Sequence, residues 1–247
     1  MGSHMTDWPI LVLTLPGDDT RRAPLLDQLA GFGLSYQLFM GVDGRSGLPA
    51  QYEAMIDRQM ARSRLGRDMS DGEFACALSH RAIYDHVRKS GLPGAIVLED
   101  DARLEPDFSR FVASRDYQSV PMVLIDFAFG RAFPLLRRKV AGGHLHRAAV
   151  QATVTTAYSV SAGAAVRLLD RTSPVSHPAD WPCELFELDA WLMVPRLARH
   201  DAPGDRVSHL DKGRPAAGTS KARRPGGFLR WLRSRISVRV GRAKGQR

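Results

Sequence analysis

The stretch AIVLEDDARLEPDF, residues 95–108, places the strongest constraint on how this chain can fold. Its first four residues are apolar and predict a buried β-strand, which ends directly in three carboxylates, Glu99, Asp100 and Asp101. Like charges at the end of a buried strand repel one another and lose hydration, so a compensating partner is expected. A metal ion, a cluster of Arg or Lys side chains, or exposure to water would each meet that need.

The beginning of the chain predicts a β-α-β unit. Residues 10–15 form an apolar run typical of a buried strand, and residues 35–44 form a second predicted strand. Between them we expect a helix with Asp19 or Thr20 as its N-cap, which stops near Gly31 and Gly33 and has one apolar side made of Leu25, Leu26 and Leu29. This alternation predicts an α/β fold with a central, mostly parallel sheet.

Further elements follow from local signals. Residues 44–69 are polar and basic, and they predict a mobile loop with a short helix near residues 52–60. Ser70 and Glu73 fit a capping box, which predicts the start of a helix that ends at Gly91. Residues 121–127 predict a strand and residues 162–171 predict a helix. Residues 183–193 predict a helix, or a helix followed by a strand.

The positive charge of the chain is concentrated at its end. The formal net charge is +9, and residues 212–247 hold 12 of the 35 Lys and Arg residues and no Asp or Glu. The other residues then carry 23 basic and 26 acidic side chains, a net charge of −3. This asymmetry indicates a body at residues 5–211 and a basic tail for an anionic surface, rather than a nucleic-acid-binding domain.

The N-terminal residues predict no export signal. Residues 1–4, MGSH, are typical of an expression-tag remnant, so Met5 is the expected native start. The sequence has neither a secretory signal nor a run of 18 apolar residues, so we expect a cytoplasmic protein. Its two cysteines, Cys76 and Cys183, support no disulfide framework and are expected as buried free thiols.

The three carboxylates at residues 99–101 allow three interpretations on composition alone. In open α/β sheets, ligands bind beyond the carboxyl ends of the strands, where carboxylates suit Mg²⁺ or Mn²⁺ and substrate phosphates. The cluster could instead be an exposed acidic turn before a helix. A phosphoacceptor pocket of the receiver type is disfavoured, because its acidic pair should follow the first strand of the chain.

Several segments together resemble glycosyltransferase family 25. They are ILVLTLPGDDTRR, GVDGR, DGEFACALSHRAIYDHV and AIVLEDDARLEPDF, in that order. The segments GRAFPLL, TTAYSVSAGAAVRLL and HPADW are similar to the bacterial lipooligosaccharide branch of this family. The resemblance covers about residues 9–189 and implies a single GT-A-like nucleotide-sugar-binding domain.

The resemblance also implies roles for individual residues. Asp101 would contact a metal, Mn²⁺ or Mg²⁺, and Glu99 or Asp100 would lie nearer the ribose or the sugar. His209 is a candidate for a C-terminal metal ligand of the kind found in GT-A enzymes. Other residues expected at the nucleotide-sugar site are Arg21, Arg22, Asp43, Ser79 and His80.

The implied reaction is inverting transfer from a UDP-sugar, with UDP-galactose favoured. It needs charge stabilisation at the leaving diphosphate and a base for the acceptor hydroxyl. Asp180 is the expected base, and Glu184 is the alternative. Closure of the segment 44–69 would help to hold the two substrates in line.

The tail segment FLRWLRSRISVRV indicates where the acceptor is met. Leu229, Leu232, Ile236 and Val240 would share one helical face, and basic residues around it favour anionic lipid. We therefore expect an enzyme at the inner face of the cytoplasmic membrane that acts on a glycolipid or lipooligosaccharide, without nucleic acid. The alternatives are a catalytically inactive scaffold of the same fold and a basic-tailed nucleic-acid-binding protein.

Overall fold

A computed structural model describes residues 7–200 and 227–241. Within them, nine strands join into one sheet in the order β11-β6-β7-β9-β5-β8-β3-β1-β2. Their bounds are β1 Ile10–Thr14, β2 Gln37–Met40, β3 Gly94–Glu99, β5 Met122–Leu124, β6 Arg131–Val140, β7 Gly143–Ala148, β8 Ala157–Ser161, β9 Ala190–Val194 and β11 Val238–Arg239. A second, two-stranded sheet pairs β4, Ala102–Leu104, with β10, Ala198–His200.

The expected β-α-β unit is confirmed at one end of the sheet. Strand β1 pairs in parallel with both β2 and β3, and β9 pairs in parallel with β5. The other five pairings of the nine-stranded sheet are antiparallel, so the described sheet is mixed rather than mostly parallel. One reason is local, because the short turn between β6 and β7 can join only antiparallel neighbours.

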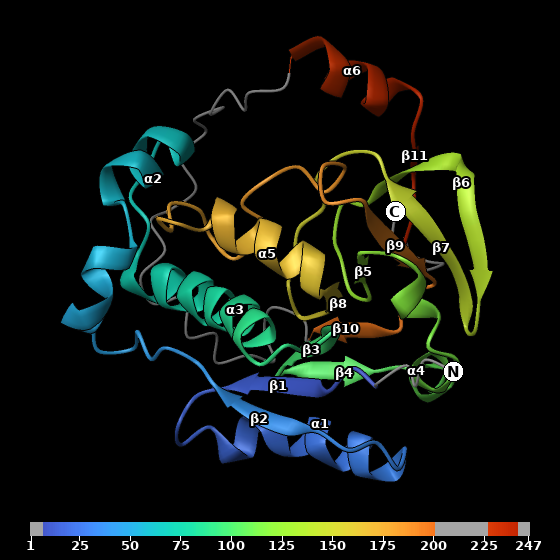
Figure 1. Ribbon diagram of the computed structural model, residues 1–247, viewed down its shortest axis with the longest axis horizontal. Coiled ribbons are helices and arrows are strands. Elements are labelled where there is room, and N and C mark those ends of the chain that lie inside the picture. Colours follow the sequence, from blue (N-terminus) through green and yellow to red (C-terminus); the bar gives the residue numbers. More distant parts are fainter. Residues whose placement is uncertain (1–6, 201–226, 242–247) are drawn as a thin grey trace.

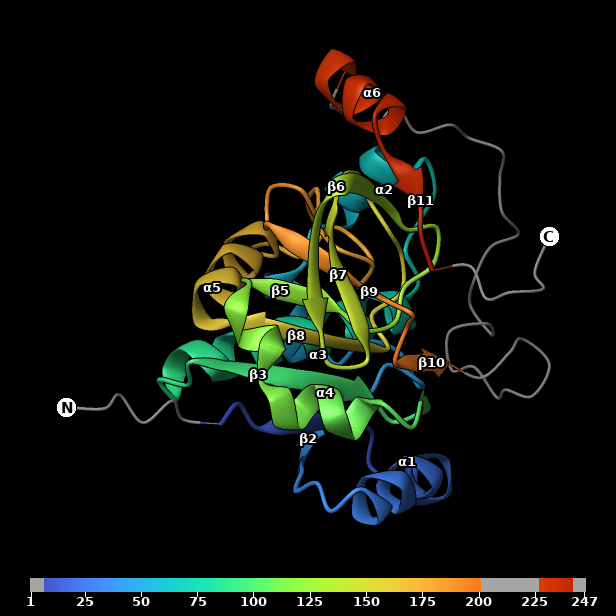
Figure 2. The same ribbon diagram turned by 90° about the vertical axis from the view of Figure 1, so that its right-hand side faces the viewer.

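Helices cover both faces of the sheet beside the N-terminal strands. They are α1 Asp19–Gly31, α3 Asp71–Lys89, α4 Phe108–Ser114 and α5 Ala162–Arg171, and the described residues also form α2 Arg58–Leu65 and α6 Gly227–Arg235 elsewhere in the molecule. Successive residues of a strand point to opposite faces. Leu11 and Leu13 of β1 therefore join a core with α3 and α5, whereas Ile10 and Val12 join a second core with α1 and α4. Figures 1 and 2 show α1 and α6 at opposite ends of the molecule.

Several local predictions are confirmed and others are corrected. Helix α1 has Asp18 as its N-cap residue, one position before the expected Asp19 or Thr20. The capping box at Ser70 and Glu73 is confirmed, and both of its hydrogen bonds are present. Helix α3 stops at Lys89, two residues before Gly91.

The segment 44–69 holds two helical pieces instead of one. A 3-10 helix spans Ala50–Met55, and α2 begins after Asp57, whose carboxylate accepts a hydrogen bond from the backbone N–H of Met60. The Asp57 cap starts a new helix and so divides the segment. The mobility of this segment and its closure over a substrate stay predictions.

The segment 183–193 contains no helix. Residues 183–189 form bends and turns, and β9 follows them directly. The described part of the expected tail, residues 227–241, forms α6 and β11, and β11 pairs with β6 as the outermost strand at that edge of the sheet. The division of the chain near residue 211 stays a prediction, since residues 201–226 lie outside those described. Among the described residues, no helix is long and apolar enough to cross a membrane.

Candidate functional site

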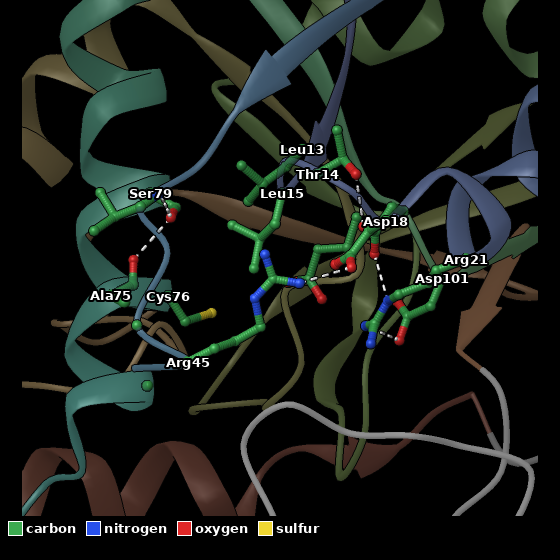
Figure 3. A pocket seen from close by; sticks show the side chains of 15 residues that line it. Leu13, Thr14, Leu15, Asp18, Arg21, Arg45, Ala75, Cys76, Ser79 and Asp101 are labelled. Atoms are coloured by element: carbon green, nitrogen blue, oxygen red, sulfur yellow. Dashed lines mark hydrogen bonds and ion pairs between the residues drawn. The ribbon is translucent and has the colours of Figure 1, made fainter. Parts of the chain in front are cut away.

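The first pocket lies beyond the carboxyl ends of β1 and β3. Its wall comes from segments far apart in sequence: the turn after β1, the start of α1, the segment after β2, the first turns of α3, and residues 99–101. Figure 3 shows these side chains converging, with Arg21 and Arg45 entering from different segments. The parallel pairing of β1 with β3 creates this site, because it places two strand ends at the same edge.

Arg21 compensates the carboxylates at the end of β3. Its Nε donates to Asp100 Oδ1 at 2.7 Å, and its Nη2 donates to Asp101 Oδ2 at 2.9 Å. Thr14 of β1 donates from Oγ1 to Asp100 Oδ2 at 2.8 Å. Both aspartates are 5% exposed, so these partners offset the loss of hydration. Burial opposes the charge of Arg21, but the charges of Asp101 and Asp100 outweigh it and raise the pKa of Arg21.

Of the two neighbouring arginines, only Arg21 lines this pocket. Arg22 is held by Asp19 on the first turn of α1, and its other contacts, with Thr14 Oγ1 and the carbonyl of Leu15, are 3.5 Å long. Consecutive helical residues project about 100° apart, so one of the pair faces the strand end and the other turns aside.

Arg45 is a pocket residue that sequence reasoning did not select. It pairs with Asp43 at 2.6 Å and with Asp18 at 3.0 Å, and it lines the pocket opposite Arg21. The hydrogen bonds that the Arg45 guanidinium donates to the Asp43 carboxylate are the main cause of the raised pKa of Arg45. Asp43 itself therefore acts on the pocket through Arg45. The motif GVDGR contains the signal, because an arginine two residues after an aspartate can bond back to it.

Ser79 and His80 of α3 hold other parts of the site in place. Ser79 Oγ accepts from the backbone N–H of Val42 and donates to the carbonyl of Ala75, both at 2.8 Å, which fixes the segment after β2. His80 lies 2.9 Å from Tyr158 Oη through Nδ1 and 3.1 Å from Glu99 Oε1 through Nε2. His80 is buried and positions Glu99.

A second pocket adjoins the first. Glu99 and Cys76 line both pockets, so these two side chains form the shared wall. Thr155 donates to Glu99 Oε1 at 2.6 Å, which adds to the hold of His80 on this carboxylate. Asp180 lines the second pocket and accepts from the backbone N–H of Val154 at 2.8 Å.

The second pocket also contains His200, which the sequence did not single out. His200 Nδ1 lies 3.0 Å from Asp126 Oδ2, and Arg196 bonds the other oxygen of Asp126 at 3.2 Å. Asp126 is fully buried at the end of the apolar run after β5. An acidic residue just after a buried strand was the available signal, as it was for Glu99, but nothing local pointed to His200.

Among the described residues, one candidate base, Glu184, does not lie with this group. Glu184 lines neither pocket and instead contacts α6, at 3.5 Å from Arg230 and 3.8 Å from Arg233. A role for Glu184 as the base is therefore not supported by its position. His209 lies outside the described residues.

In the part of the chain that the structure describes, two groups of side chains offer donors for a metal. The carboxylates of Asp100 and Asp101 supply oxygen ligands, which Mg²⁺ and Mn²⁺ prefer. Cys76, His80 and Glu99 also bring one ligand atom each to within 4.8 Å of one another. Burial raises the pKa of the Cys76 thiol well above its ordinary value, so it is a poor thiolate donor at neutral pH. The carboxylate group fits a hard divalent ion better.

Comparison with known proteins gives the same family that the motifs indicated. Residues 7–127 match glycosyltransferase family 25 (LPS biosynthesis protein), which confirms the resemblance. Over 195 residues, the chain is 26% identical to the lacto-N-neotetraose biosynthesis glycosyltransferase LgtB of Neisseria meningitidis serogroup A / serotype 4A. That match covers 69% of this chain and 64% of the relative.

Animal relatives match a shorter part of the chain. A procollagen galactosyltransferase 1 of Danio rerio is 29% identical over 104 residues, which is 41% of this chain and 17% of the relative. A probable inactive glycosyltransferase 25 family member 3 of Rattus norvegicus is 30% identical over 109 residues, 41% of this chain and 18% of the relative. The matched part thus spans less than a fifth of these relatives. The family supports glycosyl transfer in general, and some relatives are described as inactive.

Proposed function

We propose that this chain, whose residues 7–127 match glycosyltransferase family 25, transfers a sugar from a UDP-sugar to a lipooligosaccharide or other glycolipid. Galactose is the favoured sugar, transferred with inversion to a β-linkage at the inner face of the cytoplasmic membrane. The observation that carries the proposal is the pair of adjoining pockets with Glu99 in their shared wall. A transferase needs two such sites, because donor and acceptor must meet at one reacting carbon.

The first pocket suits the donor. Arg21 and Arg45 both line it, and guanidinium groups are strong partners for the oxygens of a diphosphate. Their positive charge would stabilise the negative charge that develops on the leaving diphosphate. Asp101, with Asp100 beside it, would hold Mn²⁺ or Mg²⁺. When bound, such an ion supplies Lewis-acid stabilisation worth several kcal/mol.

The second pocket suits the acceptor, and Asp180 is the proposed base. The acceptor hydroxyl oxygen attacks the anomeric carbon of the donor sugar while the bond from that carbon to the diphosphate oxygen breaks. Asp180 takes the hydroxyl proton, and UDP leaves with the bonding electron pair. The backbone N–H of Val154 orients the Asp180 carboxylate, and a positioned base typically contributes about 10²- to 10⁴-fold.

A catalytically inactive binding protein is the second candidate, since the match includes a relative described as probably inactive. Such a protein would keep the donor pocket but would not break the sugar–phosphate bond. The two candidates therefore agree on UDP binding and differ on UDP release.

Calorimetric titration of UDP in the presence of Mn²⁺ tests the donor pocket. We expect wild type to bind UDP and Asp101→Ala to bind at least about tenfold more weakly. Asp170→Ala is the matched control, because Asp170 is an exposed acidic residue on α5, which lines neither pocket. A folded wild-type protein that binds no UDP would contradict the proposal, as would equal affinities of wild type and Asp101→Ala.

A further inference from the structure

Helix α6 turns its apolar side away from the protein. The exposed fractions of its large apolar residues are 70% for Phe228, 66% for Leu229, 52% for Trp231 and 39% for Leu232, and Ile236 just beyond is 55% exposed. At 100° per residue these five side chains lie on one side of the helix, and Arg230 and Arg233 lie on the other. An isolated amphipathic helix that docked by its apolar side would have the opposite orientation.

The arginine side of α6 is fixed to the body of the protein. Arg230 and Arg233 contact Glu184, and the Arg233 guanidinium lies 4.6 Å from the ring centre of Phe186. Arg233 Nε also donates to the carbonyl of Ala149 at 3.1 Å. These contacts hold the helix in one orientation and thereby keep its apolar side outward.

The chain after α6 is anchored at the edge of the sheet. Val238 and Arg239 of β11 pair with β6, and Arg131 of β6 donates to the carbonyl of Ser234 at 2.7 Å and to that of Ser237 at 2.6 Å. Figure 2 shows β11 running from α6 to the upper end of β6. The orientation of α6 is thus held from both the helix and the strand that follows it.

Exposed apolar side chains beside β6 extend this face. Leu135, in the irregular part of β6, is 90% exposed, and Phe129, two residues before β6, is 86% exposed. Together with Phe228 and Leu229 of α6, they are the four most exposed large apolar side chains among residues 7–200 and 227–241. The ring of Phe133 in β6 lies 6.0 Å from that of Phe186, which in turn lies under α6. Phe129 and Leu135 thus belong to the part of the chain that contacts Phe186 beneath α6 through Phe133 and pairs with β11.

Basic residues accompany these apolar residues. The Arg235 guanidinium lies 5.2 Å from the Trp231 ring centre, and exposed Arg137 and Lys139 follow Leu135 on β6. Residues 212–247 contain 12 Lys and Arg and no acidic residue. Exposed apolar and aromatic side chains with surrounding cations are the combination that partitions into the interface of an anionic bilayer. A second copy of the chain would bring the same positive charge and would repel.

We propose that α6 and the region of β6 form one preformed docking face for an anionic lipid bilayer. The face consists of Phe228, Leu229, Trp231, Leu232 and Ile236 with Phe129 and Leu135. The inference deepens the proposed function and rests on its lipid-borne acceptor. Glu184 is a positioning residue for this face, because its carboxylate contacts α6. It lies four residues after Asp180, in the same loop that places Asp180 in the second pocket. Docking would thus present the acceptor pocket at a fixed height above the lipid.

Vesicle binding by the full chain tests this face. The probes are vesicles of phosphatidylethanolamine and phosphatidylglycerol, compared with vesicles of phosphatidylcholine alone, in co-sedimentation. Trp231 gives a second readout, since Trp8, Trp181 and Trp191 are at most 7% exposed and change little on docking. We expect wild type to bind the anionic vesicles at least about tenfold more tightly, with a blue shift of Trp231 emission. Absent binding, or equal binding to both vesicles, would overturn the proposal.

Three variants locate the face. The α6 variant, Phe228→Ser/Leu229→Ser/Ile236→Ser, keeps Trp231 and should weaken anionic-vesicle binding at least about tenfold. The β6 variant, Phe129→Asn/Leu135→Ser, should weaken that binding at least about threefold. The control, Leu38→Ser/Met40→Ser, changes side chains that are 40% and 50% exposed on β2, at the end of the molecule opposite α6, and should bind within about twofold of wild type. Wild-type binding by either of the first two variants would overturn the proposal. Tighter binding of a random 20-nucleotide DNA than of anionic vesicles would also overturn it, in favour of nucleic acid.

Donor turnover separates this inference from the proposed function. Release of UDP from a UDP-sugar in buffer needs no vesicle, and the α6 and β6 variants should retain the wild-type rate. Normal UDP release without vesicle binding would refute the proposed docking face and leave the proposed sugar transfer standing. Vesicle binding without UDP release would refute the proposed sugar transfer and leave the docking face standing.

Discussion

Arg21→Ala is expected to destabilise the protein more than any neighbouring surface change. Asp100 and Asp101 are each 5% exposed, and both lose a charged partner at 2.7–2.9 Å in this variant. Breaking a buried ion pair from one side costs about 3–5 kcal/mol. The Arg21 side chain is itself 29% exposed, so water can enter and partly replace it, and we expect a loss of about 2–3 kcal/mol.

Urea unfolding at pH 7, followed by circular dichroism, measures this loss. Arg22→Ala is the matched control, because Arg22 is the next residue on α1 and its partner Asp19 has a 76% exposed side chain. That pair should contribute less than about 1 kcal/mol. In Asp100→Asn/Asp101→Asn, the further change Arg21→Ala should cost much less than in wild type, since no buried charge remains to be left alone. Equal destabilisation by Arg21→Ala and Arg22→Ala would refute the view that Arg21 compensates the strand-end carboxylates.

Two further predictions concern the wall of the first pocket and the thiols. Gly44→Ala should destabilise the protein by about 1–3 kcal/mol in urea unfolding, because the new Cβ would lie 2.6 Å from the Cβ of Ala75 and 2.9 Å from the carbonyl oxygen of Asp71. The control Gly163→Ala, whose Cβ would meet nothing within 4 Å, should not destabilise the protein. Equal losses of stability in the two variants would contradict the steric argument. Burial raises the pKa of Cys183 to about 11, so alkylation by iodoacetamide at pH 8 should be about 100-fold slower than in the unfolded chain, which mass spectrometry measures. The folded state holds this proton more tightly, so stability should fall as the pH rises from about 9 to about 11; unfolded-chain alkylation rates in the native protein would contradict the shift.

The local elements were largely predictable from sequence because their signals are local. The apolar runs at β1 and β3 and the capping box of α3 each specify a backbone state within a few residues. The direction of strand β8 was not predictable in this way. It runs antiparallel between β3 and β5, and this pairing depends on contacts far along the chain.

The site was predictable where strand ends carry charge and less so elsewhere. Glu99, Asp100 and Asp101 stand out because three carboxylates end an apolar run. Nothing local distinguishes Arg21 from Arg22, since the choice depends on which side of α1 faces β3. His200 joins the second pocket only through the pairing of β10 with β4, on which no local pattern reports.

The tail, too, was predictable from sequence in its local structure but not in its packing. The composition of residues 228–236 predicts an amphipathic helix, and α6 confirms the helix. The sequence did not predict that arginines would be its inward side. That orientation depends on Glu184, which was the alternative expected base and whose carboxylate instead contacts α6.

Release of UDP from a panel of UDP-sugars, with Mn²⁺ and with EDTA, tests glycosyl transfer by this site most directly. Slow hydrolysis reports the donor even without the acceptor. We expect one UDP-sugar to be turned over by wild type and by Asp170→Ala, with Mn²⁺ only, and Asp101→Ala to be inactive. If the folded wild type turned over no donor, or if Asp101→Ala and EDTA left the rate unchanged, the carboxylates at the end of β3 would not be the donor site and the proposed transfer would fail.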